Sequence, residues 1–174
     1  MSDANTIDTD ALKRAFDEAL ARIKKDGVVT LGELKGMSEK DEEAVYAVGY
    51  NLASVGKYED ALKVFRGLVM LDHLEVKHWY ALGAVHQQLR EFDKAAQVYQ
   101  VCMFLDFFDP KPEFHCAECF LALGNEAAAL CTLNIIEENA SRPDFKAGGE
   151  KAEYLARARK LRAEIRSGGG APGK

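Results

Sequence analysis

The chain has 174 residues, a length typical of one domain that can bury a continuous core. Hydrophobic residues make up 48% of it, yet no apolar run approaches the roughly 20 residues that a transmembrane helix needs. The formal net charge of -5 argues against non-specific nucleic-acid binding. The first residues lack a basic stretch followed by an apolar one, so no secretory signal is expected and a cytoplasmic location is predicted.

Apolar residues at helical spacing predict an amphipathic helix from Asp10 to Lys25, with Asp26 and Gly27 ending it. A second, short helix is predicted to start at Thr30. We expect residues 1–8 to be disordered and residues 9–37 to form an N-terminal helical segment. Its apolar stripe either packs back on the rest of the chain or pairs with a second copy as a weak homodimer. The predicted dimerisation residues are Leu12, Phe16, Leu20 and Ile23.

A pattern of a small residue, an alanine and a larger apolar residue then recurs with a period of 34 residues. Its members are Gly49, Ala61 and Phe65; Gly83, Ala95 and Tyr99; and Ala117, Ala129 and Leu133. A period of this length is the signature of tetratricopeptide repeats (TPRs), in which each unit is a pair of antiparallel helices. We therefore predict an all-α fold, a short α-solenoid of three TPR helix pairs in residues 38–140, with units of about 42–75, 76–109 and 110–143.

The small residues have a packing reason, because the two helices of a unit must approach closely. Gly49, Gly83 and Ala117 are expected where the backbone of the second helix passes the first. Ser38 with Asp41 is typical of a capping box that opens the first unit. Within the units, Gly56 and Gly124 are expected at helix C-termini, where a left-handed backbone suits glycine, and Arg90 takes the equivalent place in the middle unit.

The chain is broken at Pro143 and again at Gly148 and Gly149. A helix is predicted after this break, from about Glu150 to Arg166, within a C-terminal segment of residues 144–166. Its apolar stripe would cover the exposed side of the third unit, a capping role that solenoids require. The stripe consists of Leu155, Ala158, Leu161 and Ile165. Basic residues on this helix are interpreted as a solvated face and not as a nucleic-acid site. Residues 167–174 are rich in glycine and are expected to be disordered.

The first helices of three TPR units line a concave groove. In TPR geometry the second, fifth, ninth and twelfth positions of each unit face it, and here these positions are mostly aromatic or apolar. The predicted groove residues are Tyr46, Tyr50, Ala53, Tyr80, Ala84, Gln87, Phe114, Glu118 and Leu121. Such a surface favours an extended, partly apolar peptide and disfavours docking through a C-terminal carboxylate. The alternative is that the aromatic residues simply pack between helices.

The run Gly56-Lys57-Tyr58-Glu59-Asp60-Ala61 and the run Phe114-His115-Cys116-Ala117-Glu118-Cys119 resemble motifs of the class II chaperones of bacterial type III secretion. The resemblance covers roughly residues 10–166 and implies an N-terminal helical segment, three TPRs and a final helix. It also implies that the protein binds two hydrophobic translocator proteins, the major and the minor one, in the bacterial cytosol and keeps them soluble. The groove would hold a segment of the P-x-L-x-x-P kind, and some members act with a transcription activator or dimerise. Ala53 departs from the tyrosine that several relatives carry.

An enzyme is not expected. Cys116 and Cys119 could together contact one metal ion, but a single such pair lacks the further ligands that zinc requires, so a packing role is favoured. The chain has no phosphate-binding glycine loop and no nucleophile or metalloprotease motif, and no cofactor is expected. Two other roles stay open: an adaptor that docks a transcription activator or a component of the secretion apparatus, and a general TPR scaffold.

Overall fold

The computed structural model describes residues 30–146 and 148–167, whose regular structure consists of eight helices. The predicted helix over residues 10–25 and its stripe of Leu12, Phe16, Leu20 and Ile23 lie outside these residues. The helices are α2 (Leu31–Leu34), α3 (Glu39–Ser54), α4 (Tyr58–Leu71), α5 (Val76–Gln88), α6 (Phe92–Leu105), α7 (Pro110–Ala122), α8 (Glu126–Ala140) and α9 (Gly149–Arg166).

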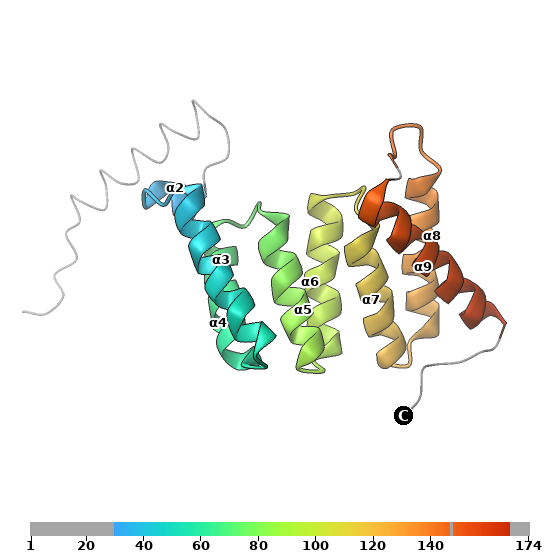
Figure 1. Ribbon diagram of the computed structural model, residues 1–174. Helices are drawn as coiled ribbons and strands as arrows, with labels where there is room; N and C mark the ends of the chain where they lie inside the picture. The colour runs from blue at the N-terminus through green and yellow to red at the C-terminus, as the bar shows by residue number, and fades with distance from the viewer. Residues whose placement is uncertain (1–29, 147, 168–174) are drawn as a thin grey trace, which may run out of the picture.

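From α3 to α9 the helices form a row in which each packs against its neighbours in the chain, and α2 packs on α4 (Figure 1). The antiparallel pairs α3/α4, α5/α6 and α7/α8 are the three TPR units, α2 precedes them, and α9 packs on α8 and α7 at the far end. The predicted all-α fold, with three helix pairs between an N-terminal helical segment and a C-terminal helix, is confirmed. No helix in the described part of the chain is both long and apolar enough to cross a membrane.

Local sequence signals determine where the first helices begin. The Ser38 side chain accepts a hydrogen bond from the Asp41 amide at 3.3 Å, and an Asp41 carboxylate oxygen accepts one from the Ser38 amide at 2.9 Å. This is the predicted capping box. Thr30 and Glu33 form a second box at the start of α2. Each box satisfies amide groups that a helix N-terminus would otherwise leave unpaired.

The turns within the three units share one backbone conformation. Gly56 has φ of 78°, Gly124 has 73°, and Arg90, at the equivalent place in the middle unit, has 59°. Left-handed backbone is readily adopted by glycine but costs an ordinary residue about 1 kcal/mol or more. The predicted turn positions are confirmed, and the middle unit tolerates a strained arginine where the other two use glycine.

The small residues of the repeat lie against side chains and not against backbone, so that detail of the prediction is wrong. A Cβ atom on Gly49 would lie 2.8 Å from Cζ of Phe65, and one on Gly83 would lie 2.8 Å from Cε1 of Tyr99. In the third unit the equivalent residues are Ala117 and Leu133, both fully buried. The close approach of the paired helices therefore depends on which side chain faces the small residue.

The C-terminal helix completes the core of the third unit. The predicted stripe packs against α7 and α8, with Leu155 and Ala158 buried and Leu161 and Ile165 partly buried. Tyr154, which the periodic pattern did not single out, is buried in the same cluster at 9% exposure. The capping role expected for this helix is thus fulfilled by burial of apolar surface that α7 and α8 would otherwise leave in water.

Candidate peptide-binding site

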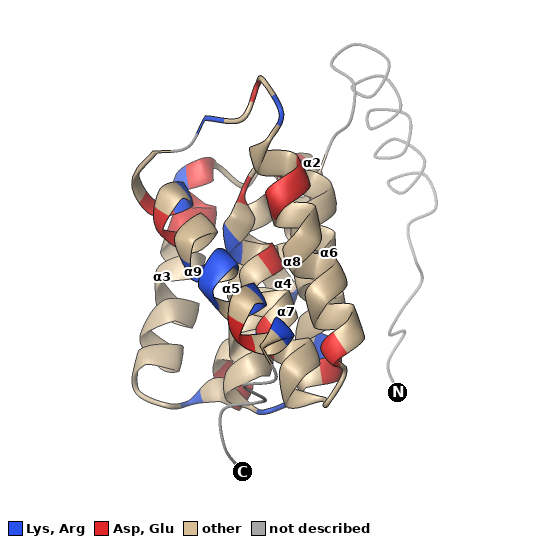
Figure 2. Cartoon of the chain, turned by 90° about the vertical axis from the view of Figure 1, so that its right-hand side faces the viewer, with Lys and Arg blue, Asp and Glu red and all other residues tan. Residues whose placement is uncertain are grey.

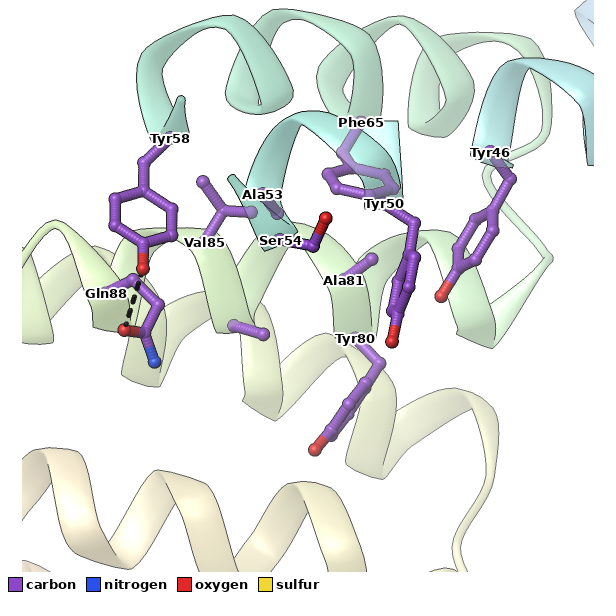
Figure 3. Close-up of a pocket in the computed structure, with 11 residues that line it drawn as sticks. Tyr46, Tyr50, Ala53, Ser54, Tyr58, Phe65, Tyr80, Ala81, Val85 and Gln88 are labelled. Carbon is purple, nitrogen blue, oxygen red and sulfur yellow. Dashed lines mark hydrogen bonds between the residues drawn. The ribbon is translucent and has the colours of Figure 1, made fainter. Parts of the chain in front are cut away.

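A pocket of about 420 Å³ lies between α3 and α5, with part of its wall supplied by α4 (Figure 3). We call it the tyrosine pocket. Its lining residues are Tyr46, Tyr50, Ala53, Ser54, Tyr58, Phe65, Tyr80, Ala81, Ala84, Val85 and Gln88. Four tyrosines with small and branched apolar residues form a mostly apolar surface with hydroxyl groups at its edge, as is usual for sites that bind a ligand by burial and a few polar contacts.

Five of the nine predicted groove residues line this pocket: Tyr46, Tyr50, Ala53, Tyr80 and Ala84. Tyr46, Tyr50 and Tyr80 project from α3 and α5 with their hydroxyl groups turned to the same side (Figure 3). Tyr50 is 62% exposed, whereas Tyr46 packs edge-on against the buried ring of Phe65 with centroids 5.5 Å apart. The pocket therefore offers one free ring and others that are already supported by the core.

The groove rule considered only four positions on the first helix of each unit, so it missed the other lining residues. Four of them lie on those first helices at other positions: Ser54, Ala81, Val85 and Gln88. Tyr58 and Phe65 come from α4, the second helix of its unit. The Tyr58 hydroxyl donates a hydrogen bond to Oε1 of Gln88 at 3.4 Å and so joins α4 to α5 across one end of the pocket (Figure 3). The Gly-Lys-Tyr run at the start of α4 was visible in the sequence, but only the fold brings Tyr58 to the pocket.

Gln87 and Glu118 lie outside the tyrosine pocket, and their polar groups are engaged within the chain. Oε1 of Gln87 accepts a hydrogen bond from the Tyr99 hydroxyl at 2.9 Å. Glu118 Oε2 lies 2.8 Å from Nδ1 of His115, and its other carboxylate oxygen is 4.0 Å from the Arg157 guanidinium. A peptide that used Oε1 of Gln87 or the Glu118 carboxylate would have to compete with these internal partners.

The third unit presents its predicted groove residues to α9. Phe114 is only 4% exposed and Leu121 9%, and both belong to the core cluster that contains Tyr154. The Phe114 ring centroid lies 5.7 Å from that of Tyr154, and the Arg157 guanidinium lies 4.3 Å from the Phe114 centroid. For Phe114 the structure thus shows the packing alternative. The open part of the groove lies in the first two units.

Two lysines stand beside the tyrosine pocket. The Lys77 ammonium lies 4.5 Å from the ring centroid of Tyr46 and pairs with Glu43, and the Lys111 ammonium lies 4.6 Å from that of Tyr80 and pairs with Glu150 at 2.8 Å. Burial raises the pKa of both Tyr46 and Tyr80, so their hydroxyls stay protonated and can donate hydrogen bonds.

Three of the four cysteines are packed in the core. Cys102, Cys116 and Cys119 are buried and Cys131 is exposed, all as free thiols. Burial raises the pKa of each of the three buried thiols to about 12, which disfavours the thiolate that metal binding or nucleophilic attack needs. In the parts of the chain that the structure describes, no group of three or more His, Cys, Asp or Glu side chains is arranged to hold a metal ion.

The basic residues of α9 face water as expected for a solvated helix face, and several are paired. Figure 2, which views the array from its C-terminal end, shows Lys and Arg on α9 among acidic residues of neighbouring helices. Arg159 donates two hydrogen bonds to the Glu137 carboxylate, at 2.9 and 3.2 Å. Charge on this face is therefore used partly to join α9 to α8.

Comparison with known proteins agrees with this arrangement. A family model described as tetratricopeptide repeat matches residues 76–109, which contain α5 and α6. Low calcium response locus protein H of Yersinia pseudotuberculosis serotype I (strain IP32953) is 33% identical over 161 residues, which are 92% of this chain and 93% of that protein.

Two solved structures of the translocator chaperone SycD from Yersinia enterocolitica are also similar. One has a TM-score of 0.69 at 33% identity and covers 80% of this chain and 100% of that chain. The other, SycD in complex with a peptide of the translocator YopD, has a TM-score of 0.65 at 32% identity and covers 75% of this chain and 95% of that chain. The chain thus belongs to the family of type III secretion translocator chaperones that includes SycD and low calcium response locus protein H.

Proposed function

We propose that the protein is a cytoplasmic chaperone that binds hydrophobic translocator proteins of a bacterial type III secretion system. An extended client segment of the P-x-L-x-x-P kind would lie along the tyrosine pocket. The observation that carries the proposal is an open, mostly apolar pocket between the first helices of the first two units, in a chain whose relative SycD has been solved with a translocator peptide. Catalysis has no part in this role.

The chemistry of the pocket suits such a segment. Tyrosine rings and small side chains accept proline and leucine side chains by burying apolar area, and the hydroxyls of Tyr46, Tyr50 and Tyr80 can donate to peptide carbonyls. Proline in the segment pre-orders its backbone, which lowers the entropy lost on binding. When bound, the chaperone would cover the client's membrane-active surface. This would prevent the client from aggregating by mass action, without nucleotide.

The proposal assigns the binding anchors to the first two units and the stabilising contacts to Gln87 and to the third unit. Tyr46, Tyr50, Ala53, Tyr80 and Ala84 would contact the segment directly. Gln87, Glu118, Phe114 and Leu121 would act through the packing described above. We further propose a weak homodimer formed through Leu12, Phe16, Leu20 and Ile23, in the N-terminal segment before residue 30.

Fluorescence anisotropy of a labelled P-x-L-x-x-P peptide tests the proposal, beside the same peptide with its prolines and leucine replaced by alanine. Saturable binding of the first peptide alone is expected. A second arm co-expresses the protein with a hydrophobic translocator and measures the soluble yield of the translocator, which should rise. Equal binding of both peptides, with no gain in soluble client, would contradict the proposal and favour an adaptor that docks a regulator or a component of the secretion apparatus.

A further inference from the structure

The tyrosine pocket is bracketed by two equivalent lysine–tyrosine pairs. Lys77 and Lys111 are 34 residues apart, as are Tyr46 and Tyr80, the rings beside which they lie. In each pair the lysine opens the first helix of the following unit, and its ammonium stands 4.5 or 4.6 Å from the ring centroid. The repeat therefore places a cation at two successive positions along the pocket, each supported by a ring that lines it.

The lysines are more firmly held than the carboxylates that neutralise them. The Lys111 side chain is 25% exposed and its ammonium lies between the rings of Tyr80 and Tyr154, 4.6 and 5.8 Å from their centroids. Glu150, its partner, is 63% exposed. Glu43, the partner of Lys77, is likewise 63% exposed against 43% for the lysine.

Surface ion pairs of this kind contribute little to stability, because both charges are well solvated when separated. Another carboxylate can therefore replace Glu43 or Glu150 at little cost, and the displaced glutamate returns to water. The ammonium groups remain in place because ring contacts hold them. Arg157 lies against the rings of Phe114 and Tyr154, neither of which lines the pocket.

From this arrangement we infer that Lys77 and Lys111 are specificity-determining residues, which select peptides that carry an acidic side chain next to the apolar anchor. The inference rests on the proposed function, since it concerns the same pocket. The apolar floor would take the anchor, and a peptide Asp or Glu would replace the glutamate at one lysine. An acidic residue would then strengthen binding where a neutral amide of the same shape would not.

The test compares two labelled P-x-L-x-x-P peptides. One carries Glu and the other carries Gln, in each case both after the first proline and after the leucine. Anisotropy titrations at low ionic strength should show the Glu peptide binding about 5-fold more tightly to the unaltered protein, with the ratio falling at high salt. In the double variant Lys77→Met and Lys111→Met the ratio should fall to about one, with binding of the Gln peptide nearly unchanged, because methionine keeps the apolar stem over each ring.

Lys63→Met is the matched control, because Lys63 lies on α4 outside the pocket and pairs with Asp60. It should leave the ratio unchanged, and circular dichroism should show equal helix content in all variants. Three results would overturn the inference while peptide binding itself stands. The ratio of Glu-peptide to Gln-peptide affinity could be near one in the unaltered protein, it could persist in the double variant, or it could fall equally in Lys63→Met. If neither peptide binds, the proposed function fails, and the inference fails with it.

Discussion

Gly83 on α5 faces the ring of Tyr99 on α6 so closely that a Cβ atom on the glycine would lie 2.8 Å from Cε1 of the tyrosine. The first unit repeats the pair as Gly49 and Phe65, and the third replaces it by alanine and leucine at the same spacing. The small residue and the large one are thus matched in size within each unit. Cores at native packing density tolerate neither a void nor an added methyl group without cost.

Gly83→Ala should destabilise the protein by about 1 to 3 kcal/mol, the range for overpacking a buried contact. Tyr99→Leu should also destabilise it, because the smaller side chain leaves a cavity between α5 and α6 and the hydrogen bond to Gln87 is lost. The double variant recreates the pair found in the third unit and should be more stable than the sum of the single effects predicts. Urea unfolding of all four proteins gives the coupling energy, and strict additivity would contradict the size-matching account.

Arg90→Gly should leave stability unchanged or raise it by up to about 1 kcal/mol. The gain comes from relief of the left-handed backbone at Arg90, where φ is 59°, and the greater freedom of glycine in the unfolded chain offsets part of it. Arg66→Gly, at an exposed site inside α4, is the control and should lower stability by about 1 kcal/mol. The melting temperatures of both variants check this, and similar losses in the two would refute it.

Glu113 should make stability fall as pH rises. It is 1% exposed, its Oε2 has no hydrogen-bond partner among the described residues, and burial raises its pKa to about 8 from 4.5. Between these two values the folded protein keeps a proton that the unfolded chain has lost, so the free energy of unfolding decreases with pH by at most about 1.4 kcal/mol per pH unit. Above pH 8 this contribution levels off.

Glu113→Gln removes the titrating group and keeps the shape of the side chain. Urea unfolding of both proteins between pH 5 and pH 9 should show a steeper decline for the unaltered protein, and the difference between the two curves isolates Glu113. Identical pH dependence in the two proteins would mean that the Glu113 carboxyl is not held in its neutral form.

Tyr50→Ala and Phe114→Ala should separate binding from folding. Tyr50 lines the tyrosine pocket and is 62% exposed, so its loss should weaken binding of a P-x-L-x-x-P peptide several-fold and leave the melting temperature nearly unchanged. Phe114 is buried beneath α9, so its replacement should cost about 3 to 5 kcal/mol of stability. Anisotropy and thermal unfolding of both variants provide the comparison. A large loss of stability in Tyr50→Ala would show that its ring belongs to the core.

The four cysteines should react in two classes. Cys131 is exposed, whereas Cys102, Cys116 and Cys119 are buried, and burial raises the pKa of these three thiols to about 12. A thiol reagent such as Ellman's should modify one cysteine quickly in the folded protein and all four only in denaturant. Cys131→Ser should abolish the fast phase. Rapid modification of a second thiol would indicate that α6, which carries Cys102, or α7, which carries Cys116 and Cys119, opens more readily than the burial of these thiols implies.

Much of the fold could be predicted from local signals and from the repeat. The capping box of Ser38 and Asp41 and the left-handed turn at Gly56 depend on residues close in the chain, and the structure contains both. The contact partner of Gly83 was not predicted correctly, because spacing locates a close approach but does not say whether backbone or a ring fills it. Tyr58 was missed at the pocket, since the periodic rule considered only the first helix of each unit.

The sequence by itself determined the number, register and direction of the helix pairs. The same inter-helix contacts must recur every 34 residues, so residues of similar size and polarity recur at that spacing. Only the tertiary structure decided which part of the groove stays open. Tyr154 and Arg157 belong to α9, outside the periodic pattern, and they cover Phe114 through ring and cation contacts that form when α9 packs on α7. No spacing rule within the repeats could place them there, because the contact joins segments about 40 residues apart through packing alone.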